Sequence, residues 1–295
     1  MDIKPLTRGF AAEVGGVELG KALADAAFAR IREAWLQYGV LVFHDQDMDE
    51  ASFVAFSRRF GELETPPADE SFGRDRSVGA GRPEIYIISN VIEDGRPIGG
   101  LGAGEAEWHT DMSYIDSPPT ASLLLAREVP SAGGDTWFAD MRAALERLPP
   151  ALRRRLGPLS AKHDSSYTSA GELRKGAERP RSAADAEGAI HALIRTHPET
   201  GRDCLFLGRR HNASVVGLGL DEGESLLDEI WRHALGPKTV YRHRWRVGDL
   251  VVWDNRATMH RRDSFSPDER RLMLRTQIRG DAPAAAVGDG HRAAG

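Results

Sequence analysis

The stretch Trp108-His109-Thr110-Asp111 places an imidazole and a carboxylate two residues apart in a chain of 295 residues. If this stretch is an extended strand, the two side chains point to the same face, where one metal ion could take both as ligands. A third ligand must come from far along the chain. His260 is the candidate we favour, because it closes the stretch Trp253–His260, just past an apolar run.

Two imidazoles and one carboxylate on one face of an octahedron leave three coordination positions open. This ligand set is typical of iron(II) enzymes that bind a chelating co-substrate and oxygen together. A single His-x-Asp pair is more often a surface hydrogen-bonding pair, so the spacing needs support from the rest of the chain. The only cysteine is Cys204, so no intrachain disulfide can form and a metal must be bound by His, Asp or Glu.

Composition excludes several classes of protein. The formal net charge is -5, so the chain lacks the basic field of a nucleic-acid-binding protein. No uninterrupted apolar run approaches the ~20 residues that a membrane span needs, and residues 1–10 do not resemble a signal peptide. We expect a globular cytoplasmic protein, a homo-oligomer, whose partner is a small molecule and neither nucleic acid nor a membrane.

Three segments carry helical patterns. In Asp25–Tyr38, apolar residues recur on one face and Gly39 follows as a left-handed cap. A second helix should follow Asp49 and end at Gly61, and a third should span Asp221–Leu235. We expect a single domain over residues 1–280 and a flexible C-terminal tail over residues 281–295.

Between the helices lie short runs rich in β-branched and apolar residues. These predicted strands are Val40–Phe43, Glu84–Val91, Ala121–Val129, Cys204–Gly208, Tyr241–Trp253 and Arg271–Arg279. No regular helical crossovers separate them, which disfavours a doubly wound parallel sheet. The pattern favours a mainly β fold, an antiparallel sandwich or barrel with peripheral helices.

Several motifs occur together in a specific order along the chain. They are Trp108–Asp111, Ser117–Pro119, Gly133–Thr136, Trp253–Asn255 with His260, and Arg271 followed by Arg275. In this order they resemble the taurine and 2,4-dichlorophenoxyacetate dioxygenase family, TauD/TfdA, over residues 6–280. The resemblance implies a double-stranded β-helix, the cupin-like jelly roll.

The resemblance also implies roles for six residues. His109, Asp111 and His260 would bind Fe(II), Thr136 and Arg271 would hold the distal carboxylate of 2-oxoglutarate, and Arg275 would reach the active centre near the substrate. A guanidinium pairs a carboxylate through two charge-assisted hydrogen bonds, and a hydroxyl can add a third.

The alternative is that Thr136 is an ordinary strand residue and that both arginines are surface charges. Alternation along a strand argues against this for the arginines, because it would turn Arg271, Met273 and Arg275 to one face. A second cation near the metal would need an anion, which could be a substrate group, the near carboxylate of 2-oxoglutarate, or Glu105.

A member of this family would oxidise, most simply hydroxylate, a small anionic organic substrate with 2-oxoglutarate and O2, releasing succinate and CO2. Asp111 argues against a halogenase, and Glu105 stands where taurine enzymes of the family have Asn. We expect the glycine-rich residues 98–104 to form a mobile loop over the mouth of the site. Two alternatives remain open, a zinc-dependent hydrolase on the same three ligands and a non-enzymatic sensor of metal or 2-oxoglutarate.

Overall fold

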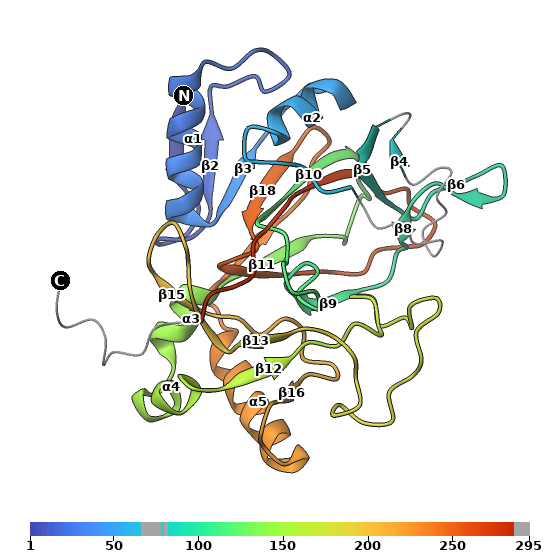
Figure 1. Ribbon diagram of the computed structural model, residues 1–295. Helices are drawn as coiled ribbons and strands as arrows, with labels where there is room; N and C mark the ends of the chain where they lie inside the picture. The colour runs from blue at the N-terminus through green and yellow to red at the C-terminus, as the bar shows by residue number, and fades with distance from the viewer. Residues whose placement is uncertain (66–77, 80–81, 286–295) are drawn as a thin grey trace.

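Two β-sheets face each other at the centre of the molecule, and helices cover their outer faces (Figure 1). The computed structural model describes residues 1–65, 78–79 and 82–285. Most neighbouring strands in both sheets are antiparallel. The predicted mainly β fold with peripheral helices is confirmed.

The larger sheet has the strand order β1-β2-β3-β18-β10-β20-β5-β4, and β8 also pairs with β5. In that order the strands are β1 Asp2–Pro5, β2 Ala12–Gly15, β3 Val40–Phe43, β18 Leu250–Asp254, β10 Ala121–Glu128, β20 Leu272–Ile278, β5 Arg82–Ser89 and β4 Val78–Gly79, with β8 at Gly100–Leu101.

The smaller of the two facing sheets has the order β17-β11-β19-β9. Its strands are β17 Val240–His243, β11 Thr136–Asp140, β19 Thr258–Arg262 and β9 Ala106–His109. In the described residues three minor sheets accompany these two: β13 Ile190–Ala192, β12 Ser160–Lys162 and β16 Ser214–Val215; β14 Ile194–Thr196 and β15 Asp203–Leu205; β6 Ile92–Glu93 and β7 Arg96–Pro97.

The helices are α1 Asp25–Tyr38, α2 Glu50–Ser57, α3 Met141–Arg147, α4 Pro150–Leu156 and α5 Leu220–Ala234. The bounds of α1 match the prediction, and Gly39 has the expected left-handed conformation with a φ of 74°. Helix α2 begins after Asp49, whose side chain accepts from the backbone N–H of Ser52, but it ends at Ser57, before the expected stop at Gly61. Helices α3 and α4 were not predicted.

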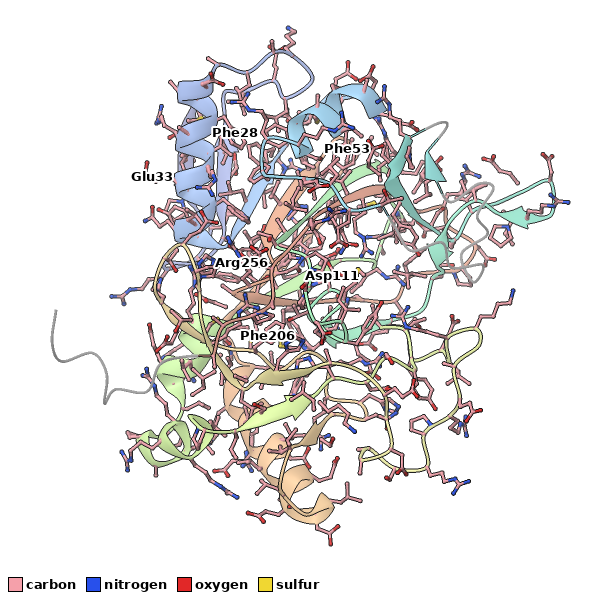
Figure 2. The ribbon with its side chains drawn as sticks, viewed as in Figure 1. Phe28, Glu33, Phe53, Asp111, Phe206 and Arg256 are labelled. Atoms are coloured by element: carbon pink, nitrogen blue, oxygen red, sulfur yellow. The ribbon has the colours of Figure 1, made fainter. Side chains whose placement is uncertain are left out.

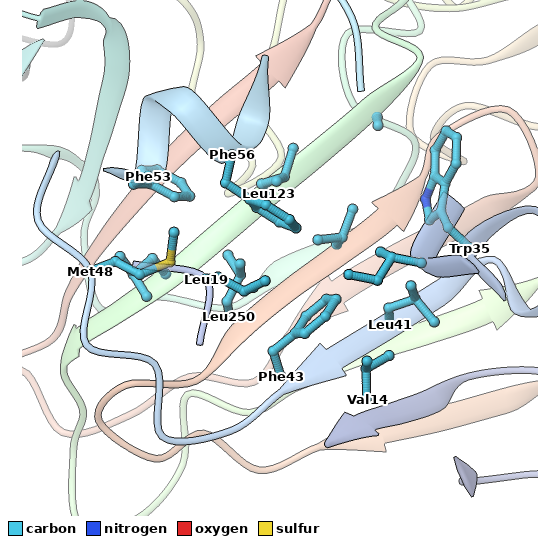
Figure 3. Packing of buried hydrophobic residues seen from close by; sticks show 14 of the residues in the cluster. Val14, Leu19, Trp35, Leu41, Phe43, Met48, Phe53, Phe56, Leu123 and Leu250 are labelled. Atoms are coloured by element: carbon cyan, nitrogen blue, oxygen red, sulfur yellow. The ribbon is translucent and has the colours of Figure 1, made fainter. Parts of the chain in front are cut away.

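Alternation along the central strands divides their side chains between two cores. On β10 and β18, Leu123, Leu125 and Val252 face outward and pack against residues of α1 and α2 (Figure 3). Leu124 and Val251 face inward, toward the smaller sheet. A third core lies on the outer face of the smaller sheet, where α3 and α5 pack. The inner faces of the two sheets therefore enclose the space that side chains of the site can reach.

One strand expectation needs correction, and the expected C-terminal tail is untested. The predicted strand Tyr241–Trp253 is two strands, β17 and β18, because Gly248 turns the chain with a φ of 84° and Asp249 accepts from the backbone N–H of Arg246. The predicted tail over residues 281–295 falls largely outside the described residues, although Ala285 forms a β-bridge with Arg195.

The single cysteine lies deep in the third core. The Cys204 thiol donates to the carbonyl of Arg256 at 3.1 Å, and burial raises its pKa to about 12. It therefore stays a protonated, packed side chain. Within the described ranges, no helix is both long and apolar enough to cross a membrane.

Candidate active site

The structure brings His109, Asp111 and His260 together at the inner edge of the smaller sheet. His109 ends β9 and faces His260 of β19 in the antiparallel register. The Nε2 atoms of both histidines lie 3.8 Å from the same oxygen of Asp111, and the three potential ligand atoms lie within 4.8 Å of one another. Figure 2 shows Asp111 near the middle of the molecule, between the large sheet and the lower elements.

The local geometry of the His-x-Asp pair differs from the one predicted. The strand ends at His109, and Asp111 belongs to the turn that follows, in which Met112 has a positive φ of 47°. His260 lies inside a strand of its own, since the chain turns after β18 and returns as β19. The turn brings the carboxylate under both imidazoles, which simple alternation along one strand would not do.

Hydrogen bonds and burial set the protonation states of the two imidazoles. Nδ1 of His109 donates to the Glu107 carbonyl at 2.7 Å, which leaves Nε2 with its lone pair toward Asp111. His260 packs between Phe138 and Trp253, with ring centroids 6.1 and 4.9 Å away. Burial lowers the pKa of His260 to about 3 and also lowers that of His109. Both rings are therefore neutral at physiological pH, as metal ligation requires.

A chain of buried hydrogen bonds orients Asp111 from behind. Ser122 on β10 donates to one carboxylate oxygen at 2.7 Å, and Asn255 donates to the Ser122 hydroxyl at 3.0 Å. Trp253 Nε1 in turn donates to the Asn255 side-chain oxygen at 2.9 Å. Burial opposes ionisation of Asp111, but Arg275 and the two histidines hold the pKa of this carboxyl below its ordinary value. Ser122 was not predicted as a site residue, because in the sequence it is only one hydroxyl-bearing residue in an apolar strand.

Arg275 reaches the carboxylate of this cluster. Its Nη1 lies 3.2 Å from the Asp111 oxygen that both histidines face, and its guanidinium lies over the Tyr86 ring at 5.1 Å. Its Nε is buried without a hydrogen-bond partner in the described part of the chain. Glu105, which the sequence offered as a partner, pairs instead with Arg261 at 3.1 Å, because the two lie on the outer side of the smaller sheet.

Arg271 lies one residue before β20 and is 1% exposed. Its backbone is fixed on both sides, since Asn90 accepts from its N–H at 2.9 Å and Ser89 donates to its carbonyl at 2.8 Å. The side chain has no carboxylate within 4 Å among the residues that the structure describes, and its Nε has no hydrogen-bond partner there. Burial, followed by the neighbouring Arg262, lowers the pKa of Arg271 to about 9.

Thr136 opens β11 directly opposite Arg262 of β19. Its hydroxyl oxygen accepts a hydrogen bond from Trp245 Nε1 at 2.9 Å. Because the indole can only donate, the threonine hydroxyl keeps its own hydrogen for an acceptor elsewhere. The Thr136 hydroxyl can therefore donate a hydrogen bond on the inner face of the sheet.

A cavity opens from the cluster. It is lined by His109, Asp111 and Arg275, by the tyrosines Tyr86, Tyr114 and Tyr167, and by two further arginines, Arg174 and Arg209. Leu101 of the glycine-rich segment also lines it, but that segment is not a free loop, because β8 pairs with β5. The cavity therefore joins two members of the cluster, His109 and Asp111, to a cationic, aromatic wall.

Residues 2–277 match the model of the family described as "Taurine catabolism dioxygenase TauD, TfdA family". The chain belongs to this family. It is 36% identical to an (S)-phenoxypropionate/alpha-ketoglutarate-dioxygenase from Sphingobium herbicidovorans, covering 98% of each chain. It is also 37% identical to an alpha-ketoglutarate-dependent 2,4-dichlorophenoxyacetate dioxygenase from Cupriavidus pinatubonensis, covering 94% of this chain and 97% of that one.

Among solved structures, AAD-2 in complex with Mn(II) and N-oxalylglycine has a TM-score of 0.76 and 32% identity, covering 96% of this chain and 98% of that one. The family and the jelly-roll fold expected from the sequence are confirmed, as is the class of 2-oxoglutarate-dependent dioxygenase, an oxidoreductase. These relatives give no support to a zinc hydrolase or to a non-enzymatic sensor.

Proposed function

We propose that this TauD/TfdA-family enzyme binds Fe(II) through His109, Asp111 and His260 and hydroxylates a small organic anion with 2-oxoglutarate and O2. The observation that carries the proposal is the cluster itself: two neutral imidazole nitrogens and one ionised carboxylate that lines a cavity beside a guanidinium. This donor set fits an octahedral ion with three open positions.

The iron would supply the oxygen chemistry, in which 2-oxoglutarate is decarboxylated to succinate and CO2 and one oxygen atom enters a C–H bond of the substrate. The protein residues hold the reactants in place. Ser122 and Arg275 keep Asp111 ionised and oriented, and the carbonyl of Glu107 fixes the tautomer of His109.

The co-substrate would place its distal carboxylate against Arg271 and Thr136. Support comes from the environment of Arg271, a buried guanidinium without an anionic partner in the described residues. A dicarboxylate would supply that missing charge, and the free hydrogen of Thr136 would add a hydrogen bond. N-oxalylglycine, which is bound in the AAD-2 structure, likewise carries two carboxylates.

The substrate anion would meet Arg275, whose buried Nε has no partner within the described ranges and which lines the cavity beside Tyr86. Relatives named for phenoxypropionate, 2,4-dichlorophenoxyacetate and sulfate esters act on organic anions. An aryloxy or alkyl group would pack on the tyrosines of the cavity wall. A carboxylate, sulfonate or sulfate ester is therefore the substrate class that we favour.

The test is a coupled assay of the protein loaded with Fe(II) in the absence of air. Oxygen uptake and succinate formation should require both 2-oxoglutarate and one member of a panel of aryloxy carboxylates, sulfonates and sulfate esters. Matched neutral amides or alcohols should stimulate succinate formation much less. Equal stimulation by the neutral analogues would overturn the anionic substrate class, and the absence of 2-oxoglutarate turnover with every compound would count against the enzyme function.

Three expectations of the sequence remain predictions. They are that residues 1–280 act as one domain, that the protein is a homo-oligomer in the cytoplasm, and that it binds neither nucleic acid nor a membrane. Size-exclusion chromatography with light scattering would test the oligomeric state directly.

A further inference from the structure

Arg262 lies two residues beyond His260 on β19, so alternation turns both side chains to the inner face of the smaller sheet. In the register between β11 and β19, Arg262 is directly opposite Thr136. Side chains paired in this way have Cβ atoms about 5 Å apart. Arg262 therefore belongs to the same wall as a metal ligand and the hydroxyl proposed for the co-substrate.

Arg262 also lies beside Arg271. The two guanidiniums are 5.6 and 5.9 Å from the centroid of the same ring, that of Phe265. Arg262 is 6% exposed, and the Nε of each arginine is buried without a hydrogen-bond partner in the described residues. The negative charge of Asp135 favours the charged form of Arg271, but the Asp135 carboxylate forms an ion pair with Arg242 at 2.7 Å.

Two buried like charges are costly when the nearby carboxylate, that of Asp135, is paired with another arginine, because desolvation and mutual repulsion add. Native proteins retain such an arrangement where a ligand supplies the opposite charge. A carboxylate offers two oxygens and about four lone-pair positions, enough to accept from two guanidiniums and a hydroxyl at once. The pair is therefore built for an anion that the protein itself does not provide.

Arg262 has a second set of contacts. Its Nη2 donates to the carbonyl of Leu101 at 2.9 Å and to the carbonyl of Gly104. Leu101 lines the cavity that His109 and Asp111 also line. One guanidinium thus touches the wall of the substrate cavity and also faces the place where the co-substrate carboxylate would lie.

We propose that Arg262 and Arg271 together bind the distal carboxylate of 2-oxoglutarate. Through its contacts with residues 101–104, Arg262 also holds that segment in place when the co-substrate binds. This inference rests on the proposed function and assigns a further binding residue to it. Discrimination against 2-oxo acids without a second carboxylate follows, since such acids leave two buried cations unpaired.

The first experiment measures co-substrate affinity by calorimetry without air, on protein loaded with Mn(II) as a redox-inert metal. Arg262→Gln should weaken 2-oxoglutarate binding by tenfold or more but change the binding of 2-oxobutyrate, which lacks the distal carboxylate, by less than twofold. Arg262→Lys, which keeps the charge, should fall between the wild type and Arg262→Gln. Mn(II) affinity should stay unchanged in all variants.

Arg261→Gln is the matched control. This neighbouring arginine faces the other side of the strand, where it pairs with Glu105 and Asp263, so its loss should leave 2-oxoglutarate affinity unchanged. The inference is wrong if Arg262→Gln and Arg262→Lys both bind 2-oxoglutarate like the wild type, or if they lose affinity for both oxo acids equally. Arg262 would then only hold residues 101–104 in place. If wild-type protein itself binds no 2-oxoglutarate, the proposed function fails instead.

The second experiment follows amide hydrogen exchange in residues 101–104. Adding 2-oxoglutarate to the Mn(II)-loaded wild type should slow exchange in this segment severalfold, and 2-oxobutyrate should do so much less. In Arg262→Gln, saturating 2-oxoglutarate should give no such protection. Protection that persists in Arg262→Gln would show that the segment responds to the co-substrate without Arg262.

Discussion

Arg271 lies just before strand β20 and Arg275 lies inside it, four residues later, yet their surroundings differ. Arg275 has a protein carboxylate 3.2 Å away, that of Asp111, and its side chain is 14% exposed on an open cavity. Arg271 is 1% exposed and, within the described residues, has no carboxylate partner. The protein itself supplies a carboxylate for Arg275, whereas in the proposed function the co-substrate supplies the one for Arg271.

This difference separates two kinds of binding residue. A guanidinium that already has a partner can take up a substrate anion by shifting its hydrogen bonds, so it tolerates substrates of different shape. A buried guanidinium without a partner demands one particular anion, and the folded protein carries the cost until that anion binds. Under the proposed function, the strict requirement for one anion therefore lies at Arg271, the co-substrate end, and the adaptable contact lies at Arg275, the substrate end.

The largest effect is expected at Asp111, which lies beside both histidines and Arg275. Asp111→Ala removes the carboxylate ligand and the partner of Arg275, so metal binding and turnover should both be lost. The measurement is Fe(II) content after anaerobic loading, together with succinate formation. Asp111→Asn should fail in the same way, since an amide is a neutral, weaker ligand. Full metal loading of either variant would contradict the ligand assignment.

Arg271→Met should separate stability from binding. Replacing a buried, unpaired charge by an apolar side chain of similar length should leave the melting temperature of the ligand-free protein unchanged or higher. The same change should weaken 2-oxoglutarate binding by tenfold or more, since losing one partner of a desolvated charge pair costs about 2–5 kcal/mol. The prediction is checked by a thermal melt and an anaerobic titration of each protein. A variant that melts lower and binds 2-oxoglutarate normally would reverse the comparison.

Arg275→Lys should have a smaller and more selective effect. An ammonium keeps the charge beside Asp111 but cannot reproduce the planar two-point contact with an anion. Metal and 2-oxoglutarate affinities should therefore survive, while the KM for an anionic substrate rises severalfold. The readout is the substrate concentration needed to perturb the absorption band of the metal–2-oxoglutarate complex. An unchanged requirement would mean that the substrate anion binds elsewhere, for example at Arg174.

Thr136→Val should have a smaller effect on the co-substrate than Arg271→Met. It removes one hydroxyl of the co-substrate end and leaves the charges intact, and a single hydrogen bond to a charged group contributes about 1.5–3 kcal/mol at most. We expect a loss of 2-oxoglutarate affinity below that of Arg271→Met, with the KM for the substrate unchanged. Trp245→Phe is the matched variant, since it frees the Thr136 oxygen but keeps its hydroxyl. A larger loss in Thr136→Val than in Arg271→Met would reverse the ranking of the two contacts.

The sequence predicted well what depends on local periodicity or on a motif. Helix α1 follows from its apolar face and from Gly39, and the three residues of the metal cluster follow from the motifs around His109 and His260. The alternation expected after Arg271 also holds, since Met273 and Leu274 pack in separate cores on opposite faces of β20.

What could not be predicted depends on register between distant strands. Ser122 matters because β10 lies where its hydroxyl meets Asp111, and Arg262 matters because β19 lies opposite Thr136. In the sequence Ser122 is only a polar residue inside a predicted strand, and Arg262 falls where no strand was predicted. Strand pairing over such separations is not encoded in local pattern. Helix α3 escaped prediction for a related reason: its Arg142 looks exposed by composition but is buried against Asp140.

The buried thiol of Cys204 can report transient unfolding around strand β15. Since no other cysteine exists, every covalent label added by a maleimide marks a molecule whose β15 has separated from the third core. The labelling rate thus measures transient unfolding around this strand under native conditions. Metal and co-substrate, bound as proposed, should slow the labelling that requires an opening of their own site.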